Sequence, residues 1–223
     1  MTDTNQKNIL EGKISEFDTT IEFFINFSRA VNHDISSHLI VIKESSRFIK
    51  EDLTNEIQGN FFDNHLDKIS TLIEKNFTCL NLLKKYYEEV SEKIHSDNWK
   101  SFPLEIKLEK RENLVKQYYN RLIESEDEMS RQMRIISFNF DKFVVNAKKL
   151  LTSLSEDREY LKNSINEEIN AATQAQLDIN RILTSLADVS TMRKVKKEPV
   201  QVTKILSNLE RTLKRSLRAS GRG

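Results

Sequence analysis

Breakers of regular structure are scarce in this chain, which has 223 residues but only four glycines and two prolines. Glycine and proline punctuate helices and build tight turns, so their scarcity excludes a fold of many short elements and predicts long uninterrupted segments. Hydrophobic residues make up 38% of the chain and charged residues 31%. That balance is typical of helices that bury one apolar stripe and expose a wide polar face.

Cysteine and long apolar runs are also lacking. Cys79 is the single cysteine, so no disulfide can form within the chain, and we interpret it as a small buried side chain. No run approaches the roughly 20 apolar residues that span a bilayer. The polar N-terminal stretch has no signal-peptide core. We therefore expect a soluble, cytoplasmic protein.

Charge of either sign is nearly balanced, with a net charge of +1, but it is unevenly spread. Residues 193–223 hold ten Lys and Arg against two Glu, a net +8, which leaves −7 for residues 1–192. Such a basic segment is typical of sites that bind nucleic acid, an anionic membrane or an acidic partner, and the alternative is a solvated tail. The candidate anion-binding residues are Arg193, Lys194, Lys196, Lys197, Lys214 and Arg215.

Helical periodicity dominates the rest of the chain. Apolar residues recur at steps of three and four in four segments, which are 14–53, 61–94, 112–154 and 159–189. Short turns between the members of each pair predict antiparallel hairpins. We predict an all-α fold in which two long hairpins pack as a four-helix bundle, within one chain or between two. A short basic helix is expected at about residues 203–217.

The breaks in this periodicity divide the chain into four parts. They are a first hairpin at 1–95, a linker at 96–111, a second hairpin at 112–192 and a basic segment at 193–223. Pro103 lies in the linker, and the alternation of Leu104, Ile106 and Leu108 after it predicts a short extended stretch.

Most patterns that carry chemistry are missing. The four histidines are scattered, no His-Glu-x-x-His zinc motif occurs, and no Gly-rich loop could hold a nucleotide phosphate. We therefore expect no cofactor, no metal and no small-molecule substrate.

One group of residues on the first predicted helix is different. Its apolar stripe places His33 on the outer side, next to Asp34, and Ser37 follows one turn later on the same side. An exposed imidazole beside a carboxylate is a competent nucleophile, because the carboxylate orients the ring and accepts a proton from it. His33, Asp34 and Ser37 are therefore the candidate catalytic residues, and Ser37 could hold a water.

The stretch NHDISSHLIVI, residues 32–42, resembles the phosphoacceptor box of sensor histidine kinases and the related box of sporulation-type phosphotransferases. The resemblance implies a helical hairpin that dimerises, with His33 accepting phosphate, Asp34 as its acid/base neighbour and Ser37 at the position used in dephosphorylation. The Asn-rich and Gly-rich boxes of the ATP-binding domain are absent. Phosphate would then have to come from another protein.

The resulting prediction is a histidine-phosphotransfer-like or kinase-derived dimerisation module of two-component signalling. Its expected partners are a receiver domain and a second copy of the chain. The alternatives are a non-catalytic helical scaffold, in which His33 is incidental, and a helical dimer that binds anionic membranes.

Overall fold

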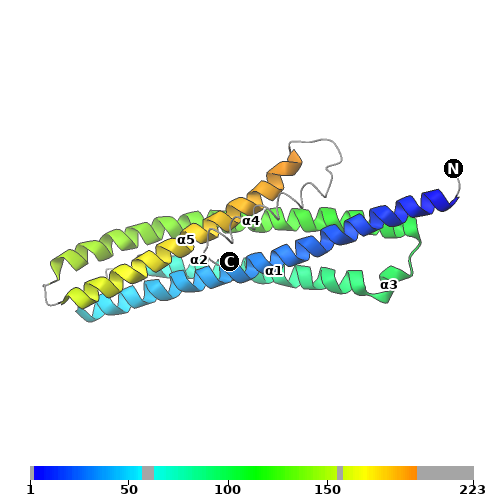
Figure 1. Cartoon of the computed structure of the whole chain (residues 1–223). Helices are drawn as coiled ribbons and strands as arrows, with labels where there is room; N and C mark the ends of the chain where they lie inside the picture. Colours follow the sequence, from blue (N-terminus) through cyan, green and yellow to red (C-terminus); the bar gives the residue numbers. More distant parts are fainter. Residues whose placement is uncertain (1–2, 57–62, 155–157, 195–223) are drawn as a thin grey trace. The chain divides into compact units, whose positions relative to one another are not determined.

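The computed structural model describes residues 3–56, 63–154 and 158–194, and these are helical apart from short connections (Figure 1). No strand occurs in these ranges. The elements are α1 (Asp3–Glu56), α2 (Asp63–His95), α3 (Asp97–Lys100), α4 (Leu104–Ser153) and α5 (Glu159–Lys194). The predicted all-α bundle is confirmed. The predicted basic helix at 203–217 lies outside the described residues.

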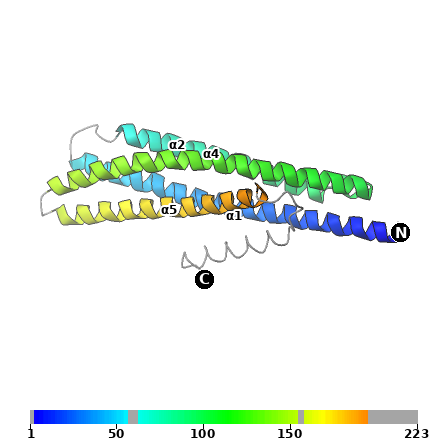
Figure 2. The same cartoon turned by 90° about the horizontal axis from the view of Figure 1, so that it is seen from above.

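The helices contribute to two compact units. Of the described residues, unit 1 comprises 3–32, 81–126 and 184–194, and unit 2 comprises 33–56, 63–80, 127–154 and 158–183. Each unit therefore draws on both predicted hairpins. In unit 2 the ends of α1 and α4 lie at the same end as the starts of α2 and α5 (Figure 1, Figure 2). Both helix pairs are thus antiparallel, and unit 2 is a four-helix bundle closed within one chain.

The core of unit 2 follows the stripes read from the sequence. Along α2 the buried apolar positions are Leu66, Ile69, Ile73 and Leu80, and Asn76 occupies the one intervening core position. These steps of three and four form a heptad pattern, which keeps one seam of the helix turned to its neighbours. The other three helices supply the rest of this core, namely Ile35, Leu39, Ile42, Ile49, Leu53, Met129, Met133, Ile136, Phe140, Phe143, Ala147, Leu151, Ile165, Ile169, Ala172, Ala175, Ile179 and Leu183.

Unit 1 has an aromatic core. Tyr118 of α4 is fully buried, and its ring lies 5.5 Å from that of Phe24 in α1 and 5.1 Å from that of Tyr86 in α2. Large flat side chains fill the space between three helices with few residues, and paired rings add a favourable contact beyond the area they bury. Burial raises the pKa of the Tyr118 hydroxyl well above its ordinary value, so this core keeps a neutral phenol.

The prediction of an extended stretch after Pro103 is wrong. Residues 104–108 are the first five residues of α4, so the helix includes residues 104–111 that were assigned to the linker. The carbonyl of Pro103 accepts a hydrogen bond from the Lys107 amide at 2.9 Å. Proline is well suited to a helix start because its missing N–H would have no intrahelical partner there, and Glu105 in the first turn favours the same end. Cys79, predicted to be buried, is half-buried.

Candidate functional site

The helical register of α1 sets the direction of His33. Ile35 and Leu39 are buried in the core of unit 2, with 1% and 0% of their surface exposed. At about 100° per residue, His33 lies nearly opposite this seam. Its side chain is 76% exposed, which agrees with the outward position expected from the sequence.

Asp34 holds one nitrogen of that imidazole. Its Oδ1 lies 3.0 Å from His33 Nδ1, and the carboxylate is 46% exposed. In the neutral ring, this contact favours the tautomer in which Nδ1–H donates to the carboxylate. Nε2 then carries the lone pair. The contact with Asp34 therefore leaves Nε2 as the ring nitrogen available to another group.

Ser37 is exposed one turn further along the helix, but its hydroxyl is turned back to the chain. Ser37 Oγ donates to the backbone carbonyl of His33 at 2.9 Å. This bond is a common way for a helical serine to satisfy its donor. The oxygen can still accept a hydrogen bond from a water, whereas its own hydrogen is already used.

Two of the remaining three histidines have hydrogen-bond partners. His38 is half-buried. His65 Nδ1 lies 3.3 Å from Asn139 Oδ1, and His95 Nδ1 donates to the Ser91 carbonyl at 2.7 Å. No group of His, Cys, Asp or Glu in the described part of the chain has the geometry of a metal site.

Two large apolar side chains close to His33 were missed by the sequence reasoning. Ile40 is 51% exposed and Val41 is 38% exposed, two turns from His33 on the outer side of α1. A contiguous patch of exposed apolar residues is typical of a surface that contacts another protein. Their position in the run Leu39-Ile40-Val41-Ile42 hid them, because only Leu39 and Ile42 continue the buried stripe.

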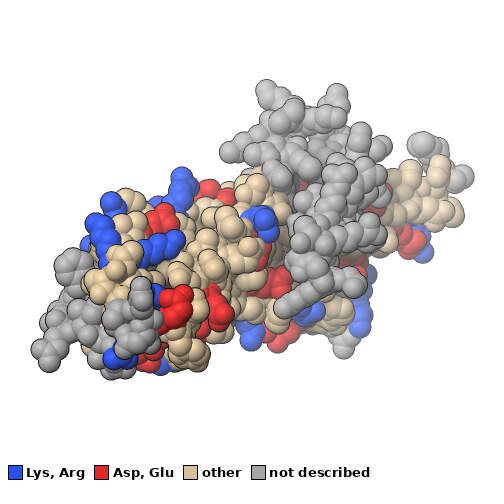
Figure 3. Space-filling view, turned by 60° about the vertical axis from the view of Figure 1, so that its left-hand side comes forward, with Lys and Arg blue, Asp and Glu red and all other residues tan. Residues whose placement is uncertain are grey.

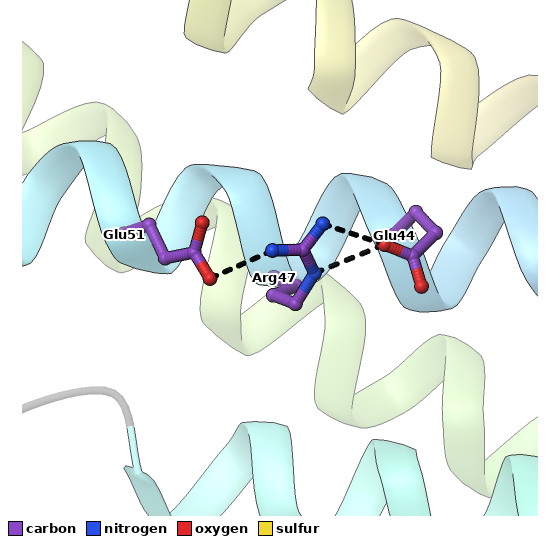
Figure 4. Close-up of polar contacts among 3 residues, drawn as sticks. All are labelled: Glu44, Arg47 and Glu51. Atoms are coloured by element: carbon purple, nitrogen blue, oxygen red, sulfur yellow. Dashed lines mark hydrogen bonds and ion pairs between the residues drawn. The ribbon is translucent and has the colours of Figure 1, made fainter.

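Further along α1, three side chains on its outer side form an ion-pair network. Arg47 reaches back to Glu44 and forward to Glu51, each at 2.8 Å (Figure 4). The hydrogen bonds to Glu44 and Glu51 raise the pKa of the Arg47 guanidinium above its ordinary value. All three side chains are about half exposed, so this network contributes little to stability. Its two carboxylates and one guanidinium leave a net charge of −1.

The candidate anion-binding residues fall mostly outside the described ranges. Arg193 and Lys194 belong to the last turn of α5. Lys196, Lys197, Lys214 and Arg215 lie beyond the described residues.

Comparisons with known proteins returned no family model, no curated protein and no solved structure that matches this chain. Among the described residues, none of the helices has a stretch long and apolar enough to cross a bilayer.

Proposed function

We propose that the chain is a histidine-phosphotransfer-like or kinase-derived dimerisation module of two-component signalling, which receives a phosphoryl group at His33 from a receiver domain. The observation that carries the proposal is the exposed His33 ring with Nδ1 held at 3.0 Å by Asp34. A free Nε2 lone pair on the solvent side is what an incoming phosphoryl group requires.

The transfer step uses these two side chains directly. Nε2 of His33 attacks the phosphorus of the receiver's aspartyl phosphate, a new N–P bond forms, and the P–O bond to the aspartate breaks, which releases its carboxylate. Positive charge develops on the imidazole during the attack. Asp34 stabilises it through the Nδ1–H hydrogen bond, as an orienting carboxylate does for a catalytic histidine.

Docking of the receiver domain would use the apolar pair Ile40 and Val41. They lie on the same side of α1 as His33, within the reach of one small interface. Ile40→Asp is expected to slow transfer from the receiver domain while leaving the reaction of His33 with acetyl phosphate unchanged. The matched control is Leu177→Asp, because Leu177 is 48% exposed on α5.

The test of the proposal is the appearance of acid-labile, base-stable phosphate on the full-length chain after incubation with a phosphorylated receiver domain. His33→Ala should abolish the label, whereas His95→Ala, which changes another exposed histidine, should retain it. Wild-type protein without label would overturn the proposal and leave the helical scaffold as the better description.

A further inference from the structure

The outer face of α4 in unit 2 combines large apolar side chains with basic ones. Ile135, Phe138 and Val145 are 45%, 61% and 51% exposed. The exposed basic side chains on the same stretch are Arg131, Arg134, Lys142, Lys148 and Lys149. We refer to these eight residues as the α4 outer face.

This face is directed away from the core of the bundle. Ile136, Phe140, Phe143 and Ala147 of the same helix are buried. At 100° per residue, the α4 outer face covers an arc of about 140° on the opposite side and extends over about 27 Å. A helix buried along one seam ordinarily presents polar residues elsewhere. Three large apolar residues in one outward arc therefore indicate a contact surface.

Four of the five cations of this face have no acidic partner among the described residues. Asp141 is the only acidic residue between positions 131 and 149. Within the described ranges no carboxylate forms an ion pair with Arg134, Lys142, Lys148 or Lys149, and only Arg131 is paired, with Glu128. Lys142 Nζ instead lies over the Phe138 ring, 5.6 Å from its centre.

On the side of the molecule drawn in Figure 3, basic and acidic side chains lie close together in several places. On α2, Lys84 pairs with Glu88 and Lys85 with Glu89 at 4.0 and 3.9 Å. Within the described part of the chain, Lys68, Lys75 and Lys93 of α2 are exposed and unpaired as well. The feature particular to the α4 outer face is therefore the combination of four unpaired cations with three exposed large apolar side chains.

We propose that the α4 outer face binds the surface of an anionic phospholipid membrane. A single outward helix forms a convex ridge, which suits a planar partner better than a peptide that needs a groove. The apolar side chains would enter the headgroup–acyl boundary, while the long cationic side chains extend to lipid phosphates and carboxylates. Negative lipid surface charge complements the unpaired cations. The proposal is independent of His33 and of the basic segment at 193–223.

The experiment is co-sedimentation of the full-length chain with vesicles of phosphatidylcholine alone and of a phosphatidylcholine–phosphatidylserine mixture. Wild-type protein should bind the mixture, and binding should weaken with added salt. The double variant Lys142→Glu, Lys149→Glu should bind the mixed vesicles at least about tenfold more weakly than wild type. The reason is that each cation near an anionic surface contributes to the free energy of binding. The matched control Lys84→Glu, Lys85→Glu should bind like wild type.

A second pair of variants tests the contribution of the apolar side chains of the α4 outer face to vesicle binding. Phe138→Ser should weaken binding, whereas Leu82→Ser, which changes a side chain 64% exposed on α2, should not. All these sites are exposed, so circular dichroism should report an unchanged helical fold.

Three results would overturn the proposal. The first is equal binding to vesicles with and without phosphatidylserine. The second is equal loss in the α4 and α2 charge variants, which would assign the attraction to net charge alone. The third is absence of vesicle binding. If light scattering then shows an oligomer that the α4 variants dissociate, the α4 outer face is a contact between copies of the chain. His33→Ala should bind vesicles normally, which keeps this test separate from the phosphate assay.

Discussion

The hydroxyl of Tyr118 donates to Ser28 Oγ at 3.0 Å inside unit 1, and this bond joins α4 to α1. Both residues are fully buried, so neither hydroxyl can exchange its partner for water. A buried hydrogen bond of this kind contributes about 1 kcal/mol, whereas leaving one member without a partner costs more.

Tyr118→Phe is therefore expected to lower the free energy of unfolding by about 1–2 kcal/mol. Ser28→Ala should have a similar effect. The double variant should lose less than the sum of the two, because it removes both polar groups together. Urea unfolding followed by circular dichroism measures all three. Additive losses would contradict a direct interaction.

Arg111 and Asp18 form a second link between α4 and α1. Arg111 is 8% exposed, its Nε donates to Asp18 Oδ1, and its guanidinium lies 5.5 Å from the centre of the Trp99 ring. Nη1 is buried without a hydrogen-bond partner. The arginine thus depends on Asp18 and Trp99 for compensation of its buried charge.

Asp18→Ala should destabilise unit 1 by about 1–3 kcal/mol, a range reduced because Asp18 itself is partly exposed. Arg111→Met should cost less, since it removes the charge and keeps the apolar stem. Thermal unfolding of the two variants shows which one loses more stability. A larger loss for Arg111→Met would show that packing of the guanidinium, not its charge, is what matters.

Asn76 interrupts the heptad core of α2 in unit 2. The residue is fully buried, its Nδ2 donates to the Leu72 carbonyl at 2.9 Å, and its Oδ1 has no hydrogen-bond partner. A buried acceptor without a partner costs free energy, and leucine has the same number of side-chain heavy atoms with the same branching at Cγ. Asn76→Leu is expected to raise the free energy of unfolding by about 1–2 kcal/mol.

A polar residue at a core position also restricts which registers can pack. Light scattering of Asn76→Leu should therefore accompany the unfolding measurement, because loss of the asparagine is expected to broaden the size distribution. A destabilised variant would mean that Asn76 is better satisfied than these contacts indicate.

Asp52 provides a test by pH. Desolvation, with smaller repulsion from Glu51 and Glu168, raises the pKa of its carboxyl above the ordinary value. A raised pKa in the folded state means that stability from this group is present at low pH and is lost as pH rises through the folded value. Asp52→Asn should thus raise the melting temperature slightly at pH 7.

The gain should disappear below about pH 4, where the carboxyl is protonated in both states. Melting curves of wild type and Asp52→Asn at several pH values measure this. The matched control is Glu51→Gln, which should not show a stabilisation at pH 7, because Glu51 forms an ion pair with Arg47. A constant difference across the pH range would contradict the assignment to Asp52.

Periodicity alone was enough to predict the helices and their buried stripes, since a three-four spacing reports directly which side of a helix is covered. It also placed His33 on the outer side of α1. It failed at residues 104–108, where alternating Leu104, Ile106 and Leu108 match a strand as well as the start of a helix. The tertiary structure decides that choice, and local alternation over five residues does not.

Contacts between residues far apart in the sequence could not be predicted from the spacing of apolar residues. The partners of Tyr118 and Arg111 lie 90 and 93 positions away in the sequence, so they emerge only from packing. The exposed apolar residues of the α4 outer face were missed for a different reason. Ile135 and Phe138 lie off the stripe that continues through Ile136 and Phe140, and the periodicity of a buried stripe assigns no role to apolar residues outside it.

The spacing of buried residues along α4 has a consequence for supercoiling. In unit 2 the steps between Met129, Met133, Ile136, Phe140, Phe143 and Ala147 alternate four and three, a seven-residue period that favours left-handed winding. From Arg111 through Leu114 and Tyr118 to Leu122 in unit 1 the steps are three, four and four. These steps make one eleven-residue interval, and a spacing of eleven favours the opposite hand where it repeats. Insertions of seven residues would thus preserve the seam in the first stretch, and insertions of eleven would preserve it in the second.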